Sequence, residues 1–122
     1  MGAPAAGDVV LVPFPFSDLS QSKLRPAVVL ADVLRGDFIL CQVTSTPYGD
    51  RIAVPLAEEG FLAGSLRRMS YARPVKLFTA NRALIVATVA TLRAEAVGEI
   101  TGRIVSVLQA GRVDGAWDPL LP

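Results

Sequence analysis

Histidine is absent from all 122 residues, and cysteine occurs only once, at Cys41. Without histidine the chain cannot build a Ser–His–Asp triad, a histidine general base or the usual zinc ligand sets. A single cysteine cannot form an internal disulfide, which favours a reducing cytoplasm. The sequence also lacks a glycine-rich phosphate loop and a Cys-x-x-Cys pair, so it predicts no metal ion and no cofactor.

Long hydrophobic runs are missing as well. No apolar stretch approaches the roughly 20 residues of a membrane span, and the N-terminus has no signal-peptide pattern, so we expect no membrane association. A hydrophobic fraction of 52% in 122 residues is enough for one domain with a real core. We expect a flexible lead-in over residues 1–6, one domain over residues 7–110 and a tail over residues 111–122.

Acidic side chains are absent from residues 60–94, although the formal net charge of the whole chain is only +1. A near-neutral protein with one wholly basic segment can carry a local positive face. The ordinary alternative is a solvated surface. The charged residues of this segment are Arg67, Arg68, Arg73, Lys76, Arg82 and Arg93.

The apolar run at residues 27–31 predicts a strand that is buried on both faces. Pro26 favours an extended backbone at Arg25, so we expect Arg25 at the entrance of this strand. Residues 9–12 predict the preceding strand, which residues 13–16 should end because their two prolines cannot donate to a ladder. A turn at residues 35–37 then predicts an antiparallel hairpin with a third strand over residues 38–44.

The rest of the chain predicts a helix after further strands. Residues 70–78 are typical of an extended segment, residues 79–82 of a turn or short helix, and residues 84–91 of a last strand, while residues 58–64 can hold a helical turn. The apolar period over residues 92–108 is helical, with Thr91 as the expected N-cap, Gly111 as the stop and Leu108 on the apolar face. Five or six strands and this helix make an α+β protein, mainly β, with a strongly bent sheet or small barrel.

The predicted hairpin brings a cation and a hydroxyl together. Arg25 and Thr44 lie about equally far from the turn at residues 35–37, so both should reach the same edge of the sheet. A guanidinium binds phosphate through two hydrogen bonds, and a hydroxyl adds another. The alternatives are an ion pair of Arg25 with Asp18 or Asp50, and ordinary turn chemistry for the hydroxyls of residues 44–46. Cys41 is expected to be a small core residue.

Three stretches in order, residues 7–14, residues 25–30 and residues 39–45, resemble the MazF/PemK family of toxin–antitoxin ribonucleases. Residues 70–78 are similar to the PemK-type branch of that family. The resemblance spans about residues 7–108 and implies a small SH3-like barrel with a C-terminal helix, the CcdB/MazF-like plasmid maintenance toxin fold. One departure is Val75, which stands where many relatives have an acidic residue after Arg-Pro.

The resemblance further implies a homodimer that cleaves single-stranded RNA without a metal and is inhibited by a cognate antitoxin. DNA binding would come only through the antitoxin. The family's active pair maps to Arg25 and Thr44, with Ser45 adjacent. Attack of a ribose 2′-hydroxyl on the neighbouring phosphate would leave a cyclic phosphate and a 5′-hydroxyl, and the sequence does not identify the base. The candidate RNA-binding residues are Ser17, Lys23, Arg51, Arg68, Arg73 and Lys76.

Two other classes of function stay open at this point. The first is a non-enzymatic toxin of the same fold that binds a protein target such as DNA gyrase. Such a protein needs no arginine–hydroxyl pair, so Arg25 and Thr44 favour the nuclease. The second is a module that binds the antitoxin and has lost its activity, which the sequence does not separate from an active enzyme.

Overall fold

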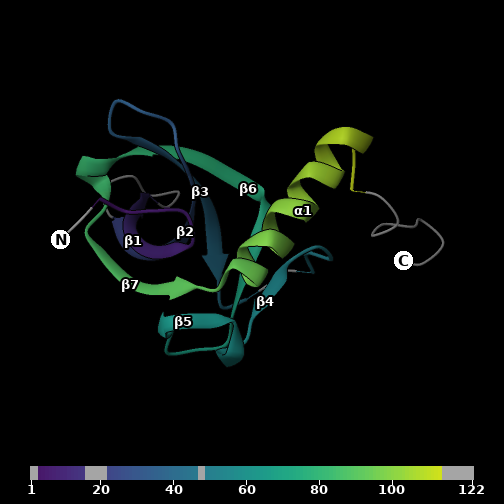
Figure 1. Cartoon of the computed structure of the whole chain (residues 1–122), viewed down its shortest axis with the longest axis horizontal. Coiled ribbons are helices and arrows are strands. Elements are labelled where there is room, and N and C mark those ends of the chain that lie inside the picture. The colour runs from purple at the N-terminus through teal and green to yellow at the C-terminus, as the bar shows by residue number, and fades with distance from the viewer. Residues whose placement is uncertain (1–2, 16–21, 47–48, 114–122) are drawn as a thin grey trace.

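The computed structural model describes residues 3–15, 22–46 and 49–113 of the chain. In this part of the chain, seven strands form one nearly closed antiparallel barrel, in the order β4–β6–β3–β2–β1–β7–β5, and one long helix lies beside it (Figure 1). The elements are β1 (Asp8–Pro15), β2 (Ser22–Asp32), β3 (Asp37–Thr44), β4 (Val54–Leu56), β5 (Phe61–Gly64), β6 (Ser70–Asn81), β7 (Ala87–Leu92) and α1 (Ala94–Ala110). The predicted fold class is confirmed, with more strands than the five or six expected. The division into residues 1–6, 7–110 and 111–122 stays a prediction.

The first strand is longer than its prolines suggest. β1 pairs with β2 as far as Pro15, opposite Ser22, so the prediction that the strand stops at Val12, before the two prolines, is wrong. The Leu11 carbonyl accepts a hydrogen bond from Val86 on the side that faces β7, and pairing with β7 stops there. Backbone groups two residues apart in a strand point to the same side, so the nitrogens of Pro13 and Pro15 face the same side as Leu11. β7 no longer pairs with β1 beyond Leu11, and the prolines therefore cost no hydrogen bond of the sheet.

Because β1 is long, Arg25 lies three residues inside β2 and not at its entrance. Burial on both faces is confirmed for residues 27–29. Val28 belongs to a buried cluster that includes Ile100 of α1, whereas Ala27 and Val29 belong to a second cluster on the opposite face of the strand. Arg25 therefore projects from a strand that is anchored from two sides.

The sheet curls tightly around the second cluster. Phe14 of β1 and Phe78 of β6 lie edge to face with their ring centroids 5.0 Å apart, although β2 and β3 separate these two strands in the sheet. Such a contact requires the sheet to bend back on itself, as the barrel on the left of Figure 1 shows. The curl therefore brings together strands that are not neighbours in the sheet.

The connections differ from expectation in detail. The hairpin turn is confirmed, with positive φ angles at Leu34, Arg35 and Gly36. Residues 58–64 hold only a short 3-10 turn before β5 begins, so the helical prediction there is wrong beyond Gly60. A turn or short helix was expected at residues 79–82, but β6 extends to Asn81 and a 3-10 turn follows at Arg82–Leu84.

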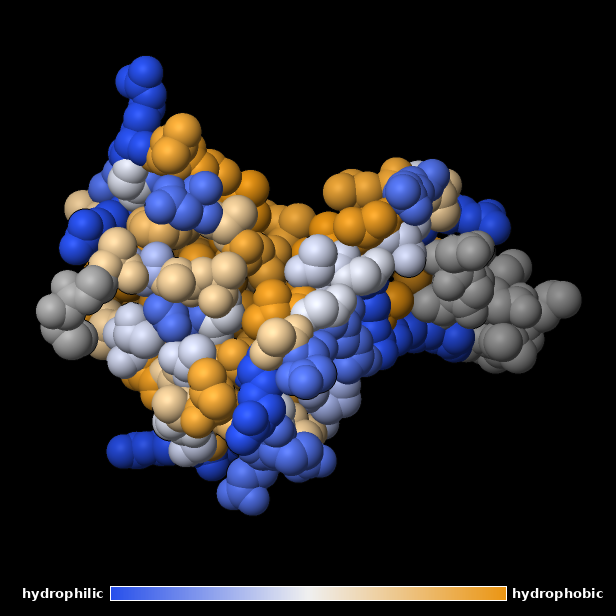
Figure 2. Space-filling model, viewed as in Figure 1, coloured by the Kyte–Doolittle hydropathy of each residue, from blue (hydrophilic) through white to orange (hydrophobic). Residues whose placement is uncertain are grey.

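The helix is confirmed, but its ends are arranged differently. Arg93 is the N-cap, because the Thr91 hydroxyl donates to the Asp8 carboxylate at 3.0 Å. Ile100 is fully buried, whereas Leu108 is 72% exposed and does not belong to the packed face. The outer half of α1 runs past the barrel (Figure 1), and Figure 2 shows hydrophobic side chains exposed at that end. Gly111 ends the helix as expected, with φ of 77° and a bond to the Val107 carbonyl.

Candidate active site

The paired part of the β2–β3 ladder ends two residues short of Arg25 and Thr44. Ala27 pairs with Gln42, and the same register continued by two residues brings Arg25 level with Thr44. These two residues and Ser45 line one hollow of about 520 Å³, which we call the Arg25 groove. The sequence-based prediction that this hairpin gathers the two side chains at one edge of the sheet agrees with this placement. Their catalytic role is a separate matter and stays a prediction.

The Arg25 groove is strongly basic. Lys23, Arg67 and Arg68 line it together with Arg25, and no carboxylate belongs to its described lining. Arg67 and Arg68 come from the segment between β5 and β6, which belongs to the stretch without acidic residues. Several like charges around one hollow raise the local concentration of anions such as phosphate. Hydrophilic side chains also gather at the lower end of the molecule in Figure 2.

The two hydroxyls of the groove differ in their surroundings. The Thr44 side chain is buried, and its Oγ1 donates to the Thr46 carbonyl at 2.9 Å and accepts from the Thr46 N–H at 3.1 Å. This is the turn chemistry that the sequence analysis held as the ordinary alternative. Ser45 is exposed beside it. Thr44 therefore shapes the end of β3, and Ser45 presents the more accessible hydroxyl.

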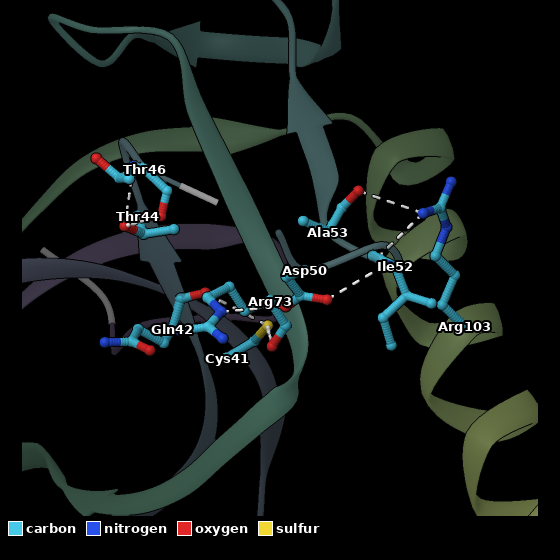
Figure 3. A network of polar contacts seen from close by, with 9 residues as sticks. All are labelled: Cys41, Gln42, Thr44, Thr46, Asp50, Ile52, Ala53, Arg73 and Arg103. Carbon is cyan, nitrogen blue, oxygen red and sulfur yellow. Dashed lines mark hydrogen bonds and ion pairs between the residues drawn. The ribbon is translucent and has the colours of Figure 1, made fainter. Parts of the chain in front are cut away.

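Arg73, a candidate RNA-binding residue, makes an ion pair instead of lining the groove. Its Nε lies 3.1 Å from Oδ2 of Asp50, and the two side chains are only 16% and 7% exposed (Figure 3). The Arg73 carbonyl also accepts a hydrogen bond from the Cys41 thiol at 3.1 Å. Burial raises the pKa of Cys41 to about 12, although the bond to Arg73 acts in the opposite direction. Cys41 is a core thiol, as expected.

The remaining candidate residues lie apart from the groove or outside the described chain. Lys76 lines a separate hollow of about 290 Å³ together with Phe14 and Phe78. Arg51 is exposed on the turn that precedes β4. Ser17 lies outside the described residues. Sequence reasoning considered Asp50 only as a partner of Arg25 and missed both its ion pair with Arg73 and the contacts of Arg103, because nothing in the local pattern marks contacts across 23 and 51 residues.

Two further observations concern what the described residues contain. None of the helices in the described part of the chain combines the length and the apolar character that crossing a membrane requires. Among residues 3–15, 22–46 and 49–113, no three side chains of the types His, Cys, Asp and Glu come close enough together to hold a metal ion.

Solved structures of similar fold come from toxin–antitoxin proteins. A MazE–MazF complex from Deinococcus radiodurans is 23% identical, with a TM-score of 0.71 over 89% of this chain and 98% of that chain. MazF alone from the same organism is 24% identical, with a TM-score of 0.67 over 89% and 99%. An endoribonuclease in complex with its cognate antitoxin from Mycobacterial species is 14% identical, with a TM-score of 0.62 over 92% and 97%. At these identities the likeness establishes the fold.

The comparison with family models goes further. A comparison with curated protein sequences finds no match. The model of the PemK-like, MazF-like toxins of type II toxin–antitoxin systems matches residues 5–108, which is most of the chain. That range includes the Arg25 groove and all the strands of the barrel. The chain belongs to the PemK-like, MazF-like toxin family of type II toxin–antitoxin systems.

Proposed function

We propose that this protein is an endoribonuclease toxin that cleaves single-stranded RNA in the cytoplasm, without a metal ion. The observation that carries the proposal is the Arg25 groove, where one hollow gathers Arg25, Thr44, Ser45 and three further cations. Family membership supports the assignment. So does the fold, which is shared with proteins named as endoribonucleases from Mycobacterial species.

The proposed reaction is a transesterification within the RNA. The 2′-hydroxyl of one ribose gives up its proton as its oxygen attacks the adjacent phosphorus. The bond from phosphorus to the 5′-oxygen of the next nucleotide breaks, and that oxygen takes up a proton. The products are a 2′,3′-cyclic phosphate and a 5′-hydroxyl, so no water is consumed. Charge builds up on the phosphate oxygens in the transition state, and the Arg25 guanidinium stabilises it.

The hydroxyls at the end of β3 hold the same phosphate. Ser45 donates to a phosphate oxygen, and Thr44 keeps Ser45 in place through its two bonds to Thr46. Holding the phosphate in line with the attacking oxygen lowers the barrier by orientation. A guanidinium keeps its proton near neutral pH, so we assign Arg25 an electrostatic role and no acid–base role.

RNA beyond the scissile phosphate is bound by the cations of the chain. Lys23 and Arg68 line the groove beside Arg25, and Arg67 joins them there. We keep Arg51, Lys76 and Ser17 as candidate contacts outside the groove. Arg73 reaches RNA only at the expense of its ion pair with Asp50.

The proposed partners are a second copy of this chain and a cognate antitoxin. The solved complexes of similar fold include MazE–MazF from Deinococcus radiodurans and a Mycobacterial endoribonuclease with its cognate antitoxin, which supports an antitoxin for this chain too. Binding of DNA is proposed only through that antitoxin. Analytical ultracentrifugation tests the homodimer, and a monomer at micromolar concentration contradicts it.

The test of the proposed function uses the purified protein and a mixed-sequence RNA in EDTA. We expect cleavage, with a cyclic phosphate on each upstream fragment and a 5′-hydroxyl on each downstream fragment. Cleavage that requires an added divalent metal ion contradicts the metal-independent mechanism. Intact RNA together with binding to gyrase, or intact RNA with antitoxin binding alone, supports one of the two non-enzymatic alternatives instead.

A further inference from the structure

The turn at residues 50–53, between β3 and β4, is held from two sides by arginines of other elements. From β6, Arg73 donates to Oδ2 of Asp50 at 3.1 Å. From α1, Nη1 of Arg103 donates to the carbonyls of Ile52 at 3.0 Å and Ala53 at 3.3 Å. Figure 3 shows the two guanidinium groups reaching the turn from different elements. The turn is therefore tied to both the barrel and the helix.

The turn also holds itself together. The Ile52 N–H donates to Oδ1 of Asp50 at 3.2 Å, and the Ala53 N–H donates to the Asp50 carbonyl at 3.2 Å. Glu99 holds the Arg103 side chain in place, because Nη2 of Arg103 lies 2.7 Å from Oε2 of Glu99. Both oxygens of the Asp50 carboxylate and the carbonyls of two successive residues are thus engaged.

Arg51 lies between these anchored residues. It is exposed, and within the described part of the chain no hydrogen bond or ion pair engages its side chain. Its backbone is fixed on one side by the bonds of Asp50 and on the other by those of Ile52. A cation on a fixed backbone loses less conformational freedom when it binds an anion than one on a loose loop.

The turn lies one strand away from the Arg25 groove. Ala72 of β6 pairs with Val43 of β3 on one side and with Val54 of β4 on the other. Val43 lines the groove, and Val54 directly follows the turn. One strand, β6, therefore separates the wall of the groove from the turn that carries Arg51.

We propose that Arg51 contacts an RNA phosphate outside the groove, and that Arg103 and the Arg73–Asp50 pair are positioning residues for this contact. The inference rests on the proposed function. It adds a phosphate-binding residue outside the groove and the residues that hold its backbone in place. Arg103 acts through the carbonyls of Ile52 and Ala53, so its loss weakens RNA binding only while Arg51 is present.

The test is a double-mutant cycle on RNA cleavage, with Arg51→Ala, Arg103→Met and both together. We expect Arg51→Ala to raise KM about fivefold to tenfold with kcat unchanged, the size of one ordinary solvent-exposed hydrogen bond. Arg103→Met should raise KM by a smaller factor, and the double variant should match Arg51→Ala alone. The slope of the logarithm of the RNA-binding constant against the logarithm of the salt concentration should fall in magnitude by about 0.7 with Arg51→Ala. The double variant should show no further change in this slope.

The matched control is Arg93→Met. Arg93 begins the same helix, and its Nε donates to the Glu59 carbonyl of an unrelated turn at 3.2 Å. If contacts between the helix and a turn matter only for stability, Arg93→Met and Arg103→Met should change KM equally. We expect Arg93→Met to leave KM unchanged. Faster amide exchange at Ile52 in Arg103→Met reports the loosened turn directly. If Arg103→Met does not fold, Arg103→Lys serves, since a lysine has one nitrogen where Arg103 uses Nη1 for the carbonyls and Nη2 for Glu99.

The outcomes separate this inference from the proposed function. A parent protein that cleaves no RNA overturns the proposed function, and the inference with it. A parent that cleaves RNA while Arg51→Ala leaves KM unchanged overturns the inference alone. The inference is also overturned if the KM of the double variant is the product of the two separate effects of Arg51→Ala and Arg103→Met.

Discussion

Arg73 of β6 and Asp50 of the turn before β4 form an ion pair that is almost entirely removed from solvent, with Nε and Oδ2 3.1 Å apart. Such a pair is costly to break one side at a time, because the remaining charge keeps its burial and loses its partner. The pair joins two segments that lie 23 residues apart in the sequence. It therefore couples the stability of the β6 strand to the shape of the turn that carries Arg51.

We expect Arg73→Met and Asp50→Asn each to lower the free energy of unfolding by about 2–3 kcal/mol. The double variant should lose clearly less than the sum, because neither charge is then stranded. Urea unfolding of the parent and the three variants at pH 7 measures this coupling. Strictly additive losses would show that the two side chains do not depend on each other.

Gly64, the last residue of β5, is the glycine that the barrel tolerates least well when replaced. Its φ is 69°, and a Cβ there would lie 2.8 Å from the Cα of Ala90 and too close to the Val89 carbonyl oxygen. We expect Gly64→Ala to destabilise the fold by more than 2 kcal/mol, roughly, through strain and a separated β5–β7 pair. Thermal unfolding followed by circular dichroism measures the loss.

Gly98 of α1 is the matched control for that substitution. A Cβ at Gly98 meets nothing within 4 Å, and the residue lies inside a helix. We expect Gly98→Ala to raise the free energy of unfolding by about 0.5–1 kcal/mol, because alanine has the higher helix propensity. Equal effects at Gly64 and Gly98 would contradict the packing of β5 on β7.

Cys41 makes the stability depend on alkaline pH. Its pKa in the folded protein is about 12, raised from an ordinary value of 9.0 by burial. The unfolded chain therefore releases the thiol proton first, so the contribution of Cys41 is fully present below pH 9 and is lost as the pH rises toward 12. The slope approaches about 1.4 kcal/mol per pH unit within this window.

The measurement for Cys41 is the gap in unfolding free energy between the parent and Cys41→Ala. We expect this gap to narrow as the pH rises from 8 to 10.5, since alanine has no proton to release. Other groups that titrate in this range affect both proteins and cancel in the difference. A gap that stays constant over the range would show that the thiol is not held in its neutral form.

RNA binding by the Arg25 groove should depend on salt. A plot of the logarithm of the binding constant against the logarithm of the salt concentration has a negative slope. The magnitude of this slope should fall by about 0.7, the value for one phosphate contact to a single strand, in each of Lys23→Ala, Arg67→Ala and Arg68→Ala. Filter binding of a 2′-O-methyl RNA from low to moderate salt gives these slopes. Arg82→Ala is the control, because Arg82 belongs to the same basic stretch but does not line the groove. An unchanged slope in all three groove variants would contradict RNA binding by the cations of the Arg25 groove.

The sequence was sufficient to predict that Arg25 and Thr44 lie at one groove, because hairpin register follows from the position of the turn. It was not sufficient for the partners of Arg73 and Arg103, since contacts between distant segments depend on how the sheet curls. The helical period correctly marked Ile100, yet it placed Leu108 on the packed face because a period does not reveal where the sheet ends. The proline rule failed at Pro13 because the sequence does not tell which side of a strand faces a partner.

The central claim is that Arg25 stabilises the transition state of RNA cleavage, and Arg25→Ala tests it most directly. The control is Arg35→Ala, since Arg35 is an exposed arginine at the opposite end of the same hairpin. We predict that Arg25→Ala lowers the single-turnover cleavage rate in EDTA by about 10² to 10³, the usual effect of removing one preorganised donor. Arg35→Ala should cut RNA at the parent rate. An Arg25→Ala protein that remains folded and cuts RNA as fast as the parent would contradict the account.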